Sequence, residues 1–236
     1  MSLTIAGVTA YAAGWQKNEA DDGSYTWSYI NGKGVKIAAP DSGVTTWHLI
    51  DGKRYAFDAD GNMLWGWVTT ESSMITDEYE WTDPDTLYYC GEPDDGARAE
   101  NEWRLITVKD PDSAGVYNIN GASGELQEYW FYFGQNGRKV YADELPVMEK
   151  SIKGRKYAFD TTGRMLSGWV NVGDGSTDED GMIPAGDFRY YGSPDKGYRS
   201  ASGWFKAYLR RSWMRASPYP DRSTRGGSMR TVRVLR

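Results

Sequence analysis

Residues 52–68 read GKRYAFDADGNMLWGWV, and residues 154–170 repeat them as GRKYAFDTTGRMLSGWV. In the first copy, Tyr55 and Phe57 alternate with small or polar neighbours. This is the period of a half-buried β-strand, with one face toward a core and one toward water. The repeated stretch therefore predicts a strand in each copy, and a fold built from repeated units.

Each copy continues through an Asp-x-x-Gly turn. Gly61 and Gly163 can take the positive φ that closes a short hairpin loop. Met63 and then Trp67 are expected on the returning strand, so that each copy forms one β-hairpin ending in Gly-Trp. A lone hairpin is marginal in water. Its repetition predicts stacked hairpins that bury one another's aromatic faces in a continuous core.

Composition favours the same class of fold. The chain has 236 residues, of which only 39% are hydrophobic, yet it contains 11 Trp, 17 Tyr and 6 Phe. Such a core must be built mainly from rings. The 28 Gly suit many tight turns. These features favour an all-β, turn-rich repeat protein over a helical or α/β one.

The order of motifs repeats along the chain. Trp27 and its turn match Trp130 at an offset of 103 residues, the Gly52 stretch matches at 102, and Trp103 matches Trp204 at 101. The sequence thus predicts two super-repeats of three hairpins each, with an acidic loop excursion at 69–86. The third hairpin of the first super-repeat is expected to open at Tyr88 and to close toward Trp103. The predicted divisions are a leading segment 1–13, super-repeats 14–103 and 104–206, and a tail 207–236.

Charge excludes some partners. The net charge is −6, although residues 209–236 alone hold eight Arg and one acid. The acidic body argues against nucleic acid, which requires a basic surface. No apolar run reaches the roughly 18 residues of a membrane span, so membrane insertion is not expected. The single Cys excludes an internal disulfide and a thiolate metal cluster, and no cofactor is expected. No signal peptide is expected in these residues, because Met1-Ser2-Leu3 is not followed by a basic and then an apolar region.

The basic tail leaves several interpretations open. It could recruit an anionic wall polymer. It could also be held by neighbouring segments or by a homodimer contact. The interpretation we prefer is a reading-frame shift after about Tyr208, because the repeat pattern stops there. The coding DNA decides between them. As translated, the tail has few apolar groups to bury and is expected to pack poorly.

Over residues 14–206 the repeated pattern is a Gly-Trp, a turn, an aromatic group, Asp-x-x-Gly, a Met and the next Gly-Trp. It resembles the cell-wall-binding repeats of Gram-positive bacteria, a family that includes choline-binding and glucan-binding modules. The resemblance implies a left-handed solenoid of stacked β-hairpins. It also implies a non-catalytic module that attaches a secreted protein to wall teichoic acid or glycan.

The resemblance also implies ligand sites. In choline-binding members, rings from successive hairpins form a cage, and ring faces attract a quaternary ammonium by about 0.5–2 kcal/mol each. The long acidic loops 69–86 and 171–187 separate some hairpins, and Cys90 stands where the second copy has Tyr191. These departures leave choline and sugar both open as ligands. The candidate ligand-binding residues are Trp67 with Tyr89 and Trp103, Trp169 with Tyr190 and Trp204, and Trp130 with Tyr132.

Each candidate has a structural alternative. Any single Trp is as readily part of the core between hairpins. The Asp58-x-Asp60-Gly61 turn could suggest calcium, but an Asx turn explains it better, since an EF-hand loop needs a Glu at its twelfth position. His48, the only His, is expected to be a linker residue. Asp94 and its neighbour are expected to be solvated turn acids.

For the whole chain, the alternative to a wall-binding module is a structural spacer or protein-interaction stalk with a purely aromatic core. A third interpretation is the non-catalytic part of a wall hydrolase.

Overall fold

The computed structural model describes residues 13–110, 126–174, 176 and 185–199, and the backbone of 203–208 and 229–234. Its strands pair antiparallel in small sheets, so the chain is all-β as predicted. Within the residues just given, two short 3₁₀ helices, η1 (Glu80–Thr82) and η3 (Ala185–Asp187), interrupt the loops. In the described part of the chain, no helix is long and apolar enough to cross a membrane.

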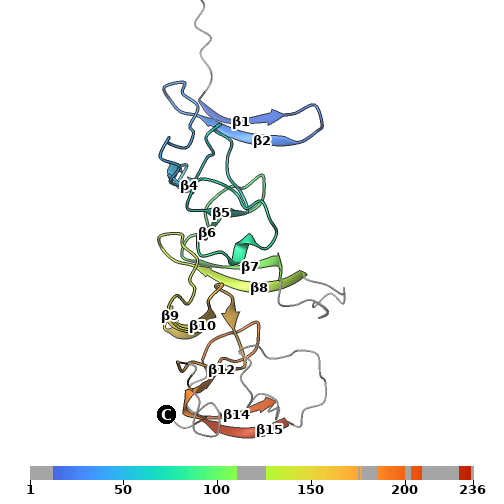
Figure 1. Ribbon diagram of the computed structural model, residues 1–236, viewed down its shortest axis with the longest axis vertical. Helices are drawn as coiled ribbons and strands as arrows, with labels where there is room; N and C mark the ends of the chain where they lie inside the picture. Colours follow the sequence, from blue (N-terminus) through green and yellow to red (C-terminus); the bar gives the residue numbers. More distant parts are fainter. Residues whose placement is uncertain are drawn as a thin grey trace, which may run out of the picture. The chain divides into compact units, whose positions relative to one another are not determined.

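Contacts divide the chain into two units. The first unit contains residues up to 101 together with 135–138, and the second contains residues 102–134 and those from 139 onward. The first unit holds three hairpins, each closed by antiparallel pairing (Figure 1). They are β1 (Gly14–Glu19) with β2 (Tyr25–Ile30), β3 (His48–Ile50) with β4 (Lys53–Tyr55), and β5 (Trp67–Thr69) with β6 (Thr86–Tyr89).

The second unit follows the same order and then begins a further hairpin. Its middle sheet has three strands, in the order β11-β10-β9. The strands are β7 (Glu102–Lys109) with β8 (Leu126–Phe133), β9 (Val147–Ile152) with β10 (Arg155–Asp160) and β11 (Met165–Leu166), β12 (Trp169–Asn171) with β13 (Phe188–Tyr190), and β14 (Gly203–Tyr208) with β15 (Met229–Val234).

Both units bury the same kinds of side chain at equivalent positions. In the first unit, a cluster of Ile50, Tyr55, Phe57 and Met63 is packed by partly buried rings. In the second, Ile152 and Phe159 are buried, and Tyr157 and Met165 pack beside them. Aliphatic side chains take a larger part than the composition predicted, because a further cluster of the second unit joins Val147, Leu166 and Val170 to a single ring, that of Tyr191. The repeated core explains why the two stretches of sequence are so alike.

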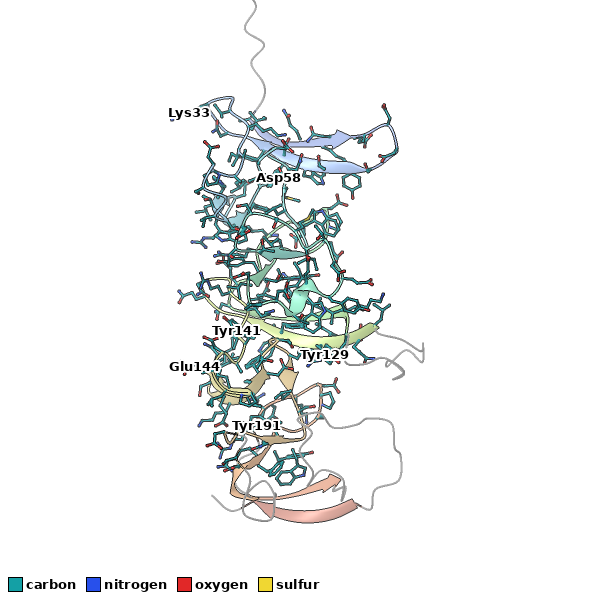
Figure 2. The ribbon with its side chains drawn as sticks, viewed as in Figure 1. Lys33, Asp58, Tyr129, Tyr141, Glu144 and Tyr191 are labelled. Atoms are coloured by element: carbon teal, nitrogen blue, oxygen red, sulfur yellow. The ribbon has the colours of Figure 1, made fainter. Side chains whose placement is uncertain are left out.

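The turn inside the repeated motif is confirmed. Gly61 has φ +76° and Gly163 has φ +91°. A Cβ at Gly61 would lie 2.7 Å from the carbonyl oxygen of Ile37, so glycine is required by space as well as by conformation. Asp58, labelled in Figure 2, accepts a hydrogen bond from the amide of Asn62 at 2.7 Å. This bond spans four residues, so Asp58 stabilises the turn without forming an Asx turn. The expected Asx turn is present in the second copy, where the amide of Thr162 donates to Asp160 at 2.9 Å.

The returning strand of the motif is only partly as predicted. Met63 does pair with Phe57 across the turn, through an isolated bridge. Trp67, however, begins β5 and pairs with Tyr89 on β6, so its prediction as the end of the same hairpin is wrong. The chain turns at Gly66, whose φ is +66°, and the next hairpin begins with β5 at Trp67.

Two further expectations need correction. The acidic excursion is a loop, but it lies inside the β5–β6 hairpin and does not separate two hairpins. The expected hairpin from Tyr88 to Trp103 does not form as one unit, since Trp103 lies on β7 and pairs with Tyr132 on β8. What remains of it is the turn at 92–96, after which the amide of Ala99 donates to the carbonyl of Tyr89 at 2.8 Å.

Candidate functional site

A set of aromatic rings gathers in each unit around one tryptophan. In the second unit, the centroid of the Trp103 ring lies 5.1 Å from that of Tyr132, 4.7 Å from Tyr157 and 5.7 Å from Phe159, the last of these stacked. Edge-to-face and offset arrangements at these distances are favourable between rings. The hairpin pairing explains part of the set, because Trp103 and Tyr132 are directly opposite on β7 and β8.

The first unit repeats this arrangement. Trp15 lies 5.1 Å from Tyr29, 4.7 Å from Tyr55 and 6.0 Å from Phe57, again stacked on the phenylalanine. Trp15 and Tyr29 are opposite on β1 and β2, as Trp103 and Tyr132 are on β7 and β8. Both units therefore present the same ring frame, and they differ in the side chains around it.

In the second unit, a half-open cleft of ≈ 310 Å³ borders the ring frame. It draws on four segments of the chain: β7, β8, the β10–β11 pair and the turn after β13. An antiparallel bridge between Tyr157 and Tyr198 brings that last turn to β10. The residues that line the cleft are Trp103, Trp130, Arg155, Tyr157, Met165, Asp195, Lys196 and Tyr198.

A glycine shapes one wall of this cleft. Gly197 has φ +55°, and a Cβ there would lie 2.1 Å from the Sδ atom of Met165. Gly96 does the same for Met63 in the first unit, with φ +58° and 2.2 Å. The methionine can take its place beside the rings only because this position has no side chain.

The cleft carries charge of both signs at its rim. The guanidinium carbon of Arg155 lies 4.3 Å from the centroid of the Tyr198 ring, a cation–π contact. Lys196 and Asp195 are exposed neighbours on the turn. Trp130, on β8, is partly buried and lines the cleft; within the described residues it makes no contact with another ring. Its ring therefore borders the open volume of the cleft.

The equivalent positions of the first unit are occupied by internal contacts. The indole Nε1 of Trp27 donates to Asp94 at 2.9 Å, and the hydroxyl of Tyr25 donates to the same carboxylate at 3.1 Å. The indole hydrogen bond is the main reason that the pKa of Asp94 lies below its ordinary value. Lys53 pairs with Asp95 at 3.3 Å.

The structure places the predicted ligand residues in different settings. Trp67 and Tyr89 are opposite on β5 and β6, with ring centroids 5.3 Å apart, and Trp67 is buried. Trp169 and Tyr190 are likewise opposite, with centroids 5.4 Å apart. Trp103 does not join Trp67 in one unit.

Trp103 and Trp130 line the cleft together, and Tyr132 is buried behind Trp103. The backbone of Trp204 lies in β14, and its side chain lies outside the described residues.

The residues of the cleft that sequence reasoning missed are mostly polar. Tyr157 and Met165 stand in the quoted motif and could have been found by asking which motif positions face the turn after β13. Asp195 and Lys196 could have been found by aligning that turn with Asp94-Asp95-Gly96 of the first copy. Arg155 carried no signal, because the equivalent Lys53 looks like an ordinary surface residue.

No family model matches this sequence, and no curated protein matches it. Among solved structures, the chain is similar to CbpF in complex with ipratropium, with 17% identity and a TM-score of 0.46 over 80% of this chain and 43% of that one. It is similar to CbpJ from Streptococcus pneumoniae, with 21% identity and a TM-score of 0.38 over 85% and 65%.

It is also similar to a pneumococcal cell wall endolysin from phage Cp-1 complexed with choline, with 15% identity and a TM-score of 0.18 over 84% and 40%. The chain spans less than half of the CbpF chain and about two thirds of the CbpJ chain.

Proposed function

We propose that this chain is a non-catalytic binding module that attaches a secreted protein to a bacterial wall polymer through the cleft of its second unit. The observation that carries the proposal is the open cleft beside Trp103, Trp130 and Tyr157. Concave sites with ring walls and a few polar groups at the rim are typical of ligand binding. The resemblance of the repeat motif to cell-wall-binding repeats supports a wall ligand.

Ring faces give such a site two ways of binding a wall polymer. They attract the positive head group of a choline-like ligand, or they stack on the apolar face of a sugar ring. Trp130 is suited to either, because no ring of the described chain covers it. Several weak sites along one chain would gain affinity together, since a polymer presents its groups repeatedly.

The second candidate function is a structural spacer or protein-interaction stalk. The observation that favours it is the burial of other rings: Trp81 is 1% exposed, and Trp67 is 6% exposed. These two rings lie against each other, with centroids 6.5 Å apart, and have no face free for a ligand. A spacer would use every ring in this way, and the cleft of the second unit would then have no ligand.

The deciding experiment is sedimentation of the protein with purified Gram-positive cell wall. Trp130→Ala should weaken retention about tenfold per site, because it removes one ring wall of the cleft. The matched control is Trp65→Ala, which removes a tryptophan that is 39% exposed and lies outside the cleft. Release of soluble wall fragments should remain at background for all proteins. Equal retention of both variants and the unchanged protein would contradict the proposal.

A further inference from the structure

The charged side chains around the cleft of the second unit restrict the class of ligand that it accepts. Arg155 and Lys196 are both exposed and line the cleft with a single carboxylate, that of Asp195. Within the described part of the chain, neither cation forms an ion pair with a carboxylate. The three groups together leave one net positive charge at the rim.

This charge is unfavourable for a ligand that is itself a cation. The Arg155 guanidinium already occupies a face of the Tyr198 ring, 4.3 Å from its centroid. A quaternary ammonium would have to use the remaining rings beside two cations that no carboxylate pairs with. Repulsion between like charges would offset part of the attraction from each ring face.

The first unit has the opposite charge on the same ring frame. The equivalent positions hold Lys53, Asp94 and Asp95, which give one net negative charge. Lys53 is paired with Asp95, so it is not available to an anion. The two units therefore share the same ring frame but carry opposite net charge around it. The difference lies in the side chains beside the rings and not in the core.

We propose that the cleft of the second unit binds an acidic sugar, a pyranose that carries a carboxylate or a phosphate. The sugar ring stacks on the faces of Trp130 and Trp103. Arg155 and Lys196 donate charge-assisted hydrogen bonds to the acid group, for which a guanidinium has matching geometry. Asp195 accepts hydrogen bonds from sugar hydroxyls. This inference rests on the proposed wall-binding function and narrows its ligand.

The test is calorimetric titration with matched sugars. N-acetylmuramic acid and N-acetylglucosamine share one ring and differ by a lactyl carboxylate, and N-acetylglucosamine 6-phosphate offers a phosphate in its place. At low salt, at least one acidic sugar should bind about tenfold more tightly than the neutral one. The preference should shrink in 0.5 M salt, because both cations are exposed. Trp130→Ala should abolish the binding of all three.

A charge-reversal variant tests whether Lys196 causes the preference for acidic sugars. Lys196→Asp gives the turn the Asp-Asp-Gly sequence that the first unit already folds with, so the turn should form as before. The variant should lose the preference for acidic sugars and keep its affinity for the neutral one. The control is Lys33→Asp, which changes net charge equally at an exposed turn of the first unit and should leave the preference intact.

The outcomes separate this inference from the proposed function. Choline binding as tightly as the acidic sugars, or equal affinity for acidic and neutral sugars, would overturn the inference. If no sugar binds but sedimentation with wall still depends on Trp130, the inference fails and the wall-binding function stands. If an acidic sugar binds with the expected preference but the protein is not retained on wall, the inference stands and the wall-binding function fails.

Discussion

One buried arginine in the second unit holds two carboxylates. The Nε of Arg164 donates to Asp160 at 2.7 Å, and its Nη1 donates to Asp110 at 2.8 Å, with all three side chains no more than 5% exposed. Asp110 also accepts a hydrogen bond from the hydroxyl of Tyr129, labelled in Figure 2. Removing one member of such a cluster costs about 3–5 kcal/mol, because a charge is left buried without its partner.

In the first unit, the position equivalent to Arg164 does not form an ion pair. Asn62 stands where Arg164 stands, and its Nδ2 donates to Asp58 at 2.9 Å. The hydroxyl of Thr26 donates to Asn62 at 3.2 Å, from the position that Tyr129 has in the second unit. A neutral amide and a buried guanidinium thus hold the same turn in the two copies.

The first prediction concerns alkaline stability. Burial, and then the hydrogen bond to Asp110, raise the pKa of Tyr129 above its ordinary value near 10. Burial and Glu149 likewise raise the pKa of Tyr191. Because the unfolded chain releases these protons first, stability is full below about pH 10. It then falls by up to about 1.4 kcal/mol per pH unit for each group.

Urea unfolding between pH 8 and pH 12 measures this slope. Tyr129→Phe should make the curve shallower above about pH 10, because a group that titrates differently in the two states is gone. Tyr191→Phe should remove a similar share. An unchanged slope in both variants would show that other groups control alkaline unfolding.

At the scale of the elements, the hairpin turns contain backbone conformations that are unfavourable for residues other than glycine. The turn between β9 and β10 has Lys153 at φ +48° and Gly154 at φ +77°. Two positive φ values are the mark of a type I′ turn, which joins strands with the right twist and prefers Asn-Gly. Lysine has no side-chain feature that favours this conformation. The turn therefore keeps a strain that one substitution can relieve.

Lys153→Asn should raise the free energy of unfolding by about 0.5–1 kcal/mol, because asparagine tolerates the left-handed region. Thermal and urea unfolding measure the change. The control is Lys150→Asn, an exposed site on β9 where φ is not positive; it should be neutral or slightly destabilising. Stabilisation by the control, or none by Lys153→Asn, would argue against strain in the turn.

Local sequence signals predicted the turns and the short pairing of Phe57 with Met63 across one of them, but they did not predict the more distant strand partners. The Asp-x-x-Gly turns and the alternation through Tyr55 appear in the structure because each depends on neighbouring residues alone. The pairing of β5 with β6 crosses a loop of more than a dozen residues, and no local pattern marks it. The strand β9 was missed because only Val147 and Ile152 are buried in it, and the residues between them are largely exposed.

The residues of the cleft were likewise predicted only in part. Trp103 and Trp130 were predicted because the repeat marks ring positions in both copies. Arg155 and Lys196 were not, since their closeness depends on the bridge that joins β10 to the turn after β13. Contacts between segments some forty residues apart follow from the fold and not from spacing along one strand.

At the scale of the molecule, the two units share the same pattern of backbone hydrogen bonds. The amide of Gly66 donates to the carbonyl of Gly91 at 2.9 Å, and the amide of Gly168 donates to that of Gly192 at 2.9 Å. These glycines lie 102 and 101 residues apart. The β14–β15 pairing begins with Gly203 opposite Val234, so the strand order of a super-repeat starts again.

Because the two units share this hydrogen-bond pattern, we predict that one whole repeat period can be deleted from the chain and the rest will still fold. A chain lacking residues 92–192 joins Gly91 to the residue that follows Gly192, and it keeps the hydrogen bond from Gly66. Gly197 would then face Met63, as Gly96 does now. We expect this shortened chain to give a β-rich circular dichroism spectrum and one cooperative unfolding transition.

The control deletion removes residues 92–160, which is not a whole period. It leaves β11 without β10, to which it pairs, and should expose the rings that the sheet covers. Binding of a dye for apolar surface would report that exposure. If both deletions fold equally well, the period has no structural meaning.

The near-constant distance between equivalent residues has a consequence for the gene. Unequal crossing-over between the two copies removes or adds about one period wherever the breakpoint falls. Each turn glycine then meets the same kind of neighbour that it met before. Such a locus can change length in whole steps without passing through an unfolded product. Among related strains we expect its alleles to differ by complete super-repeats, with breakpoints spread through the period.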